Sequence, residues 1–215
     1  MTIEAPYPSR TEAGCIEIYD DVMPQSAANK LIESFEFSDA STLCKAEYSK
    51  ARMGAGPQSI SGGLYRSNQT MGLFPHECED KDCKMTNAIE YLLERYVACV
   101  NHYQSKYEVE IGFDEGFQLL KYSPGNEYKA HSDSGPGHDF RVVSGLILLN
   151  PSEYIGGGTY FTNFDVTIKT DTPSIILFPS NYAYMHRAKA VLDGIKYAIV
   201  TWMGPPWRGP ELHEQ

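Results

Sequence analysis

The sequence predicts a mainly β fold with flanking helices, arranged as a jelly roll or a small barrel. Glycine (18), proline (13) and tyrosine (15) are plentiful among the 215 residues, which favours short strands and tight turns over a helical bundle. From residue 117 onward, short apolar runs alternate with turns rich in glycine and proline, as is typical of such folds. The length fits a single domain, residues 1–215, with a sizeable core.

The first part of the chain, residues 1–116, is expected to support the barrel with helices and strands. Residues 15–24 predict a short strand that ends in a turn. Apolar residues recur at helical spacing from about Gln25 to Phe35 and again from about Met85 to Tyr107, so both segments are expected to form helices. Residues 49–63 are rich in glycine and serine and lack periodicity, which predicts a mobile loop. The sequence leaves open whether this loop is a lid over a site or a plain surface connection.

The second part of the chain, residues 117–203, is expected to form the jelly-roll core. Turn signals such as Pro124-Gly125 and Asp193-Gly194 separate its strands. The expected strands cover residues 117–122, 127–131, 141–149, 158–163, 165–169, 174–179, 182–187 and 196–203.

Charge, apolar stretches and cysteines indicate which classes of protein the sequence does not fit. The formal net charge of −10 disfavours broad binding to nucleic-acid phosphates. The N-terminus has no apolar run after a basic start, and no apolar stretch is long enough for a membrane span, so a cytoplasmic protein is expected. The five cysteines are scattered, which indicates reduced thiols. His76, Cys78 and Cys83 lie close together, but their spacing matches no standard zinc pattern.

Three residues form a candidate metal site. His131 and Asp133 are separated by one residue, so on a strand both side chains would point to the same face. His186 stands about fifty residues later, next to another predicted strand, and a jelly roll brings such distant strands together. Two imidazoles and one carboxylate are the ligands of non-haem Fe(II) sites that keep positions open for oxygen chemistry.

A basic residue accompanies this candidate site. Lys196 follows His186 with nine residues between them and begins the last predicted strand. A lysine ammonium that points into a cavity lined by strands needs an anion. A His-X-Asp tripeptide alone arises often by chance, and a lysine at a strand start is commonly exposed. The combination of all four residues is what favours an iron site with a nearby anion pocket.

The stretch from Phe117 to Met203 resembles the 2-oxoglutarate- and Fe(II)-dependent dioxygenases, specifically the prolyl 4-hydroxylase branch. Three blocks carry the resemblance: YSPGNEYKAHSD at 122–133, GGGTYF at 156–161, and the segment 177–203 with the distal histidine, a glycine and the basic residue. The N-terminal segment IEIYDDVMPQSAANKLI also resembles the start of such domains.

The resemblance implies a double-stranded β-helix in which His131, Asp133 and His186 bind iron. It implies that Lys196 pairs with the 5-carboxylate of 2-oxoglutarate. Further residues carried over from the family are Tyr122, Thr159 and Trp202 for the co-substrate pocket, and Arg141 and Tyr128 for the substrate. Two positions depart from the family: Leu148 stands where members often have a tyrosine that helps to bind the 5-carboxylate, and Ala190 replaces the usual proline.

The function expected from this resemblance is hydroxylation of prolyl residues in a peptide or protein, with Fe(II), 2-oxoglutarate and O2, and with ascorbate as a further candidate reductant. Two alternatives stay open. One is a hydroxylase of a free amino acid or another small molecule in the same superfamily. The other is a non-catalytic jelly-roll binding module, although such a module would be free to lose a metal ligand or Lys196, and this chain keeps all four residues.

Overall fold

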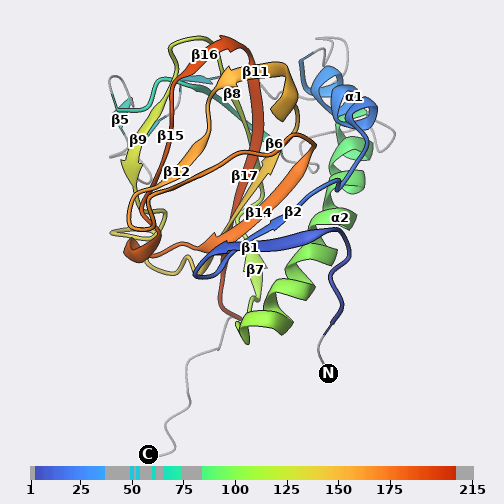
Figure 1. Ribbon diagram of the computed structural model, residues 1–215, viewed down its shortest axis with the longest axis vertical. Helices are drawn as coiled ribbons and strands as arrows, with labels where there is room; N and C mark the ends of the chain where they lie inside the picture. Colours follow the sequence, from blue (N-terminus) through green and yellow to red (C-terminus); the bar gives the residue numbers. More distant parts are fainter. Residues whose placement is uncertain are drawn as a thin grey trace, which may run out of the picture.

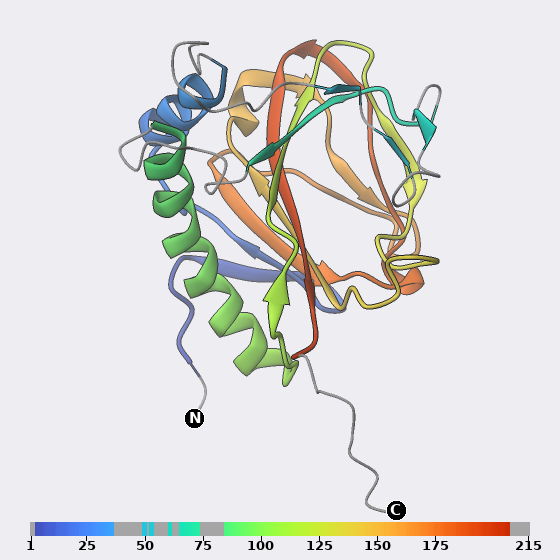
Figure 2. The ribbon, with the colours of Figure 1, turned by 180° about the vertical axis from the view of Figure 1, so that it is seen from behind.

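The computed structural model describes residues 3–36, 49–50, 52–53, 60–61, 65–73 and 84–206 (Figure 1). These residues form two facing β-sheets, two short strand pairs and two helices. The mainly β fold with flanking helices and its double-stranded β-helix arrangement are therefore confirmed. The helices α1 (Gln25–Glu36) and α2 (Lys84–Tyr107) lie on one side of the larger sheet, as both ribbon views show (Figures 1 and 2).

Among the described residues, the larger sheet has nine strands, and every pairing in it is antiparallel. Its order is β1 (Ser9–Ala13), β2 (Ile16–Tyr19), β14 (Ser174–Pro179), β10 (Val143–Leu148), β17 (Lys196–Gly204), β8 (Phe117–Tyr122), β6 (Gln69–Leu73) and β3 (Ser49–Lys50), with β7 (Phe113–Asp114) beside β17.

The smaller sheet, as far as the structure describes it, has the order β13 (Val166–Ile168), β12 (Thr159–Phe161), β15 (His186–Ala188) and β9 (Tyr128–His131). Two further strand pairs stand apart: β11 (Tyr154–Gly156) with β16 (Val191–Gly194), and β4 (Arg52–Met53) with β5 (Ile60–Ser61).

Side chains of the larger sheet alternate between two apolar clusters, because successive residues of a strand point to opposite faces. Ile147 and Ile199 face the helices and join the cluster that holds Leu31 and Leu92. Their neighbours on the other face, such as Leu146, contact the smaller sheet. The helices thus cover one face of the larger sheet, and the space between the two sheets is left for a site.

The predicted elements agree closely with the structure except at 182–187, and several further strands were not anticipated. The strand expected at 182–187 is wrong in its first half, because the Asn181 side chain accepts a hydrogen bond from the Ala183 amide and starts a 3-10 turn (Tyr182–Tyr184); the strand itself begins at His186. The short strand and the turn expected within 15–24 are confirmed as β2 (Ile16–Tyr19) and the bend at 22–23. The strands β1, β6 and β7 and the pair β11–β16 were not anticipated.

The segment expected to be a loop, 49–63, includes β3 and the pair β4–β5, while residues 51, 54–59 and 62–63 lie outside the described residues. Its role as a lid therefore stays a prediction, as does the organisation of residues 1–215 as one domain. His76, Cys78 and Cys83 also lie outside the described residues. Neither α1 nor α2 combines the length and apolar character that a membrane span requires.

Candidate active site

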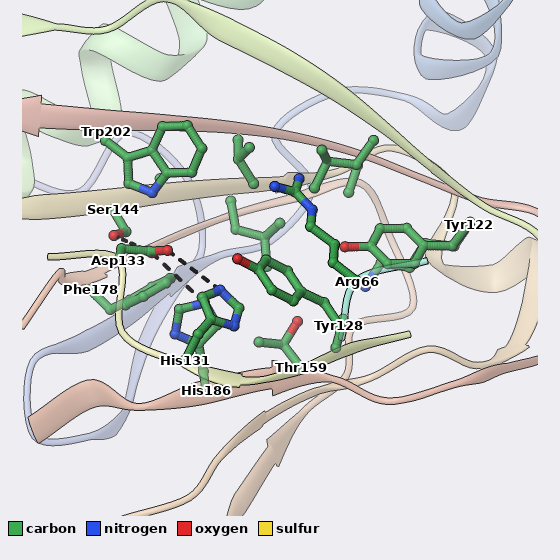
Figure 3. A pocket seen from close by; sticks show the side chains of 17 residues that line it. Arg66, Tyr122, Tyr128, His131, Asp133, Ser144, Thr159, Phe178, His186 and Trp202 are labelled. Carbon is green, nitrogen blue, oxygen red and sulfur yellow. Dashed lines mark hydrogen bonds and ion pairs between the residues drawn. The ribbon is translucent and has the colours of Figure 1, made fainter. Parts of the chain in front are cut away.

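The three predicted metal ligands come together at the open end of the space between the sheets (Figure 3). His131 ends β9 and His186 begins β15, and the two residues lie directly opposite each other in the antiparallel pair. Asp133 follows in the bend after β9, with its carboxylate oxygens 3.5 Å from Nε2 of His131 and 3.8 Å from Nε2 of His186. One ligand atom from each residue lies within 4.8 Å of the others.

Asp133 lies beyond the end of β9. The alternation of side chains along a strand therefore does not explain why its carboxylate faces the two histidines. The bend that carries it is tied to Ser180, the residue after β14. The Ser134 amide donates to the Ser180 carbonyl at 2.9 Å, and the Ser132 hydroxyl donates to the same carbonyl at 3.0 Å. These bonds fix the position of the carboxylate over the neighbouring strand end.

Both histidines present the same ring nitrogen to the site. Nδ1 of His131 lies 2.8 Å from the Lys129 carbonyl, and Nδ1 of His186 lies 3.1 Å from the Tyr184 carbonyl. A carbonyl only accepts, so each Nδ1 carries the hydrogen and each Nε2 is left with a lone pair for a metal. Burial lowers the pKa of His186 to about 4, so this imidazole is neutral near pH 7, as a metal ligand must be.

The carboxylate of Asp133 is held in its ionised form. Burial by itself would raise the pKa of Asp133, but the neighbouring imidazoles of His186 and His131 and a hydrogen bond from Ser144 outweigh burial and hold it well below its usual value. The Ser144 hydroxyl donates to Oδ2 at 2.6 Å and lies 2.9 Å from the Ser180 hydroxyl. An ionised carboxylate and two imidazoles on one side match the ligand set of Fe(II) sites with open positions.

A cavity extends from the triad over the inner face of the larger sheet. Register places Ser144 opposite Trp202 near the metal ligands and Lys196 opposite Tyr122 at the other end. The lining between these two rows is apolar and consists of Leu120, Leu146, Ala198 and Val200. The cavity therefore has two polar ends separated by an apolar middle.

Lys196, at the start of β17, supplies the polar group at the end of the cavity that is far from the triad. Its side chain is 2% exposed, and its ammonium donates one hydrogen bond, to the Gly157 carbonyl at 2.7 Å. The rings of Tyr122 and Tyr154 lie 5.4 Å and 5.8 Å from Nζ. No carboxylate forms an ion pair with Lys196 in the described part of the chain, and burial alone lowers the pKa of Lys196 to about 8.

All nine predicted site residues lie at this cavity or its mouth. His131, Asp133, His186, Lys196, Tyr122, Thr159, Trp202 and Tyr128 line the cavity, and Arg141 lines the groove outside it. In Figure 3 the Thr159 hydroxyl points toward the space beneath Tyr128. The Tyr128 ring stacks on His131, with 3.6 Å between the ring centroids.

Arg141 is engaged within the protein as well as facing the groove. Its guanidinium makes two hydrogen bonds to Glu115, at 2.5 Å and 2.6 Å, and a third to the Asp133 carbonyl at 3.2 Å. It also lies 3.9 Å from the centre of the Trp202 ring. Arg141 thus braces the bend that holds Asp133, a role that spacing along the sequence could not indicate.

The sequence reasoning missed Arg66, which lines the cavity, and Tyr154, which is a neighbour of Lys196. Arg66 forms an isolated β-bridge with Tyr128 and places its guanidinium 4.6 Å from the centre of that ring. Tyr154 reaches Lys196 from β11. Arg66 stands in a stretch without periodicity, and β11 was not anticipated, so neither residue had a local signal.

Outside the cavity, a groove of about 440 Å³ opens beside the triad. Tyr128, His131, Asp133 and Trp202 line both spaces. The groove adds residues from several elements: Lys50, Thr70, Gln118, His138 and Arg141. A molecule in the groove would therefore reach the metal ligands directly.

Comparisons with known proteins agree with this geometry. Residues 117–204 match the family described as the 2OG-Fe(II) oxygenase superfamily. A PKHD-type hydroxylase of Rippkaea orientalis is 31% identical over 101 residues, which are 44% of this chain and 45% of that protein. A PKHD-type hydroxylase of Synechococcus elongatus is 31% identical over 102 residues with the same coverage. The match thus spans less than half the length of these curated relatives.

Solved structures show the same fold at lower identity. A prolyl hydroxylase from Trichoplax adhaerens, in complex with a peptide fragment of the hypoxia inducible factor oxygen degradation domain, has a TM-score of 0.69 at 19% identity, covering 88% of this chain and 83% of that one. A prolyl-4-hydroxylase from Pseudomonas putida has a TM-score of 0.59 at 16% identity, covering 90% and 93%. The resemblance to the 2-oxoglutarate- and Fe(II)-dependent dioxygenases is confirmed over residues 117–204, and that family match implies Fe(II), 2-oxoglutarate and O2.

Proposed function

We propose that this chain, whose residues 117–204 match the 2OG-Fe(II) oxygenase superfamily, is an Fe(II)- and 2-oxoglutarate-dependent hydroxylase of prolyl residues in a peptide or protein. One observation carries the proposal: a complete His-Asp-His triad and a buried ammonium without an acidic partner stand at opposite ends of one described cavity. A metal site alone would not require the lysine, and a structural lysine would not be left without a counterion.

The cavity suits a short 2-oxo dicarboxylate. The head of 2-oxoglutarate carries a carboxylate and a keto oxygen, which would lie beside His131, Asp133 and His186. Its methylene groups would contact the apolar middle of the cavity, and its distal carboxylate would pair with Lys196. When bound, iron supplies the oxidative decarboxylation that gives succinate and CO2 while a C–H bond of the substrate becomes C–OH.

The remaining residues would position the two substrates. Tyr122 and Thr159 line the cavity and offer hydroxyls to the co-substrate. Trp202 and Tyr128 stand where the cavity meets the outer groove, and Arg141 faces that groove. The groove lies outside the cavity and takes its lining from several separate elements, which supports a peptide as the substrate. The Trichoplax protein with the same fold is in complex with a peptide, which supports this proposal for the substrate class.

The test is product analysis with a proline-rich peptide, Fe(II), 2-oxoglutarate and O2. A mass gain of one oxygen atom on a proline residue is the expected result. A gain on a free amino acid or another small molecule, with none on any peptide, would move the substrate to the alternative class. Absence of iron from both the wild-type protein and Asp133→Ala would indicate a binding module without chemistry.

A further inference from the structure

The outer groove beside the triad has a charge opposite in sign to that of the whole chain. The sequence holds 28 acidic and 18 basic residues. Among the described residues, the groove is lined by three basic side chains, Lys50, Arg66 and Arg141, and by one acidic side chain, the metal ligand Asp133. An anionic group is therefore attracted to this groove although the chain as a whole is acidic.

Most of this positive charge comes from one stretch of the sequence. Between residues 48 and 76 the chain has three basic residues, Lys50, Arg52 and Arg66, and no acidic residue. Four residues of this stretch line the groove, namely Ser49, Lys50, Arg66 and Thr70. One continuous segment therefore gives this side of the groove its charge.

The three basic side chains of the groove differ in what already contacts them. Arg141 makes two hydrogen bonds to the Glu115 carboxylate. Arg66 donates a hydrogen bond to the neutral side-chain amide of Asn68 at 3.0 Å. Lys50 is exposed on β3 and forms no ion pair with any residue that the structure describes. Lys50 is therefore the cation that an incoming anion can pair with most readily.

The lining of the groove crosses four neighbouring strands of the larger sheet. Lys50 lies on the edge strand β3, Thr70 on β6, Gln118 on β8 and Trp202 on β17, and these strands follow one another in the sheet. Trp202 also lines the cavity of the triad. Neighbouring strands lie about 4.8 Å apart, so Lys50 stands roughly 14 Å from the end of the groove that holds the metal ligands. An extended peptide covers that distance with about four residues.

We propose that the peptide substrate carries an acidic side chain about four residues from the hydroxylated proline, and that this side chain pairs with Lys50. The inference rests on the proposed function and narrows its substrate class to acidic peptides. An aspartate or glutamate at that distance reaches the Lys50 ammonium while the target residue lies beside the metal ligands. Lys50 is thus a specificity-determining residue that favours acidic peptides over neutral and basic ones.

The size of the effect follows from the exposure of Lys50. Solvent screens an exposed ion pair, and one such pair strengthens binding by up to about fivefold. A lysine in place of the acidic residue of the peptide turns this attraction into repulsion, so acidic and basic peptides should differ by about tenfold at low salt. The difference should shrink at about 0.5 M salt, because exposed charges are then screened over a few ångströms.

The experiment compares peptides that differ at one position and carry glutamate, glutamine or lysine there. The position is set at three, four or five residues from the target proline, on either side of it. Product mass gives kcat/KM for hydroxylation, and fluorescence anisotropy with Zn(II)-loaded protein gives Kd without turnover. The wild-type protein is expected to prefer glutamate over lysine by about tenfold in both measurements, on one side of the proline. Lys50→Glu should reverse the order, so that the lysine peptide becomes the preferred one.

Lys30→Glu is the matched control, because it changes the net charge by the same amount. Lys30 is exposed on α1, and the helices cover the face of the larger sheet opposite the groove. This variant should keep the wild-type order of peptides. Equal use of all the peptides by the wild-type protein at low salt would overturn the inference, and so would the same change of order in Lys50→Glu and Lys30→Glu. An unchanged order in Lys50→Glu would overturn it as well. Absence of both binding and hydroxylation for every peptide would contradict the proposed function, and the inference with it.

Discussion

Replacement of Lys196 by methionine should change co-substrate binding and protein stability in opposite directions. The ammonium is buried, and its folded-state pKa of about 8 lies below the ordinary value of 10.5. That difference corresponds to a cost of about 3 kcal/mol for keeping the charged form in the folded protein. The hydrogen bond to Gly157 offsets about 1 kcal/mol of this cost.

Lys196→Met should therefore raise the free energy of unfolding of the ligand-free protein by about 2 kcal/mol at pH 7. For a chain of this length the gain corresponds to about 4–8 °C in Tm. The same substitution removes the partner of the distal carboxylate, at a cost of about 2–5 kcal/mol. The Kd for 2-oxoglutarate should rise by about 30-fold to several thousand-fold.

The pH dependence follows from the direction of the pKa shift. Because the folded pKa is lowered, the folded state binds fewer protons than the unfolded state between pH 8 and about 10.5. The free energy of unfolding of the wild-type protein should rise across this window as the destabilising charge is lost, and Lys196→Met should abolish that rise. The affinity for 2-oxoglutarate should fall above pH 8 in the wild-type protein.

The assays are thermal unfolding of the ligand-free protein and calorimetry of 2-oxoglutarate with metal-loaded protein. Lys30→Met is the control, because Lys30 is exposed on α1 and should change neither quantity. A Lys196→Met protein that is less stable than the wild type, and that binds 2-oxoglutarate within threefold of it, would refute the assignment of Lys196 as an anion partner.

Three further substitutions probe the metal site and its support. Asp133→Ala should lower iron content at least tenfold while the circular dichroism spectrum stays native, and a variant that keeps stoichiometric iron would remove Asp133 from the ligand set. Ser144→Ala removes the 2.6 Å hydrogen bond to Asp133 and should weaken iron binding by about 10–100-fold in a metal titration; unchanged affinity would show that Ser144 does not orient the carboxylate. Glu17→Ala removes the ion pair between Oε2 of Glu17 on β2 and Nζ of Lys106 on α2, which lie 2.8 Å apart. It should lower the free energy of unfolding by about 3 kcal/mol in a urea titration without changing the Kd for 2-oxoglutarate. A large change in that Kd would contradict a purely structural role.

The sequence predicts the strands of the sheets well because each one is a short apolar run between turn residues. Phe117–Tyr122 and Ser174–Pro179 match their predicted bounds, and both helices end at or within one residue of the predicted position. The error at 182–187 has a local cause. The Asn181 side chain bonds to the backbone two residues later, and this turn competes with an extended strand.

The ligand triad is predictable, but the way it is held is not. Ligand chemistry singles out His131, Asp133 and His186 from their spacing and from the strands around them. The contacts that orient them join residues far apart in the chain, such as Ser144 with Asp133 and Arg141 with Glu115. Spacing along one sequence carries no information about such pairs.

The pocket around Lys196 shows the same limit. Its position opposite Tyr122 follows from the register of β17 and β8, which the sequence does not specify. The departure at Leu148 is visible in the sequence as a gap in a family pattern. The space of about 410 Å³ that Leu148 helps to line becomes visible only when β10, β11 and β13 are placed together.

The most direct test of the central claim is consumption of 2-oxoglutarate by the purified chain under O2, with succinate as the product that is measured. Succinate should form with added Fe(II) and increase when a proline-rich peptide is present. It should be absent without iron and in Asp133→Ala. A folded, iron-loaded wild-type protein that forms no succinate, with or without peptide, would contradict the assignment of this cavity as a dioxygenase active site.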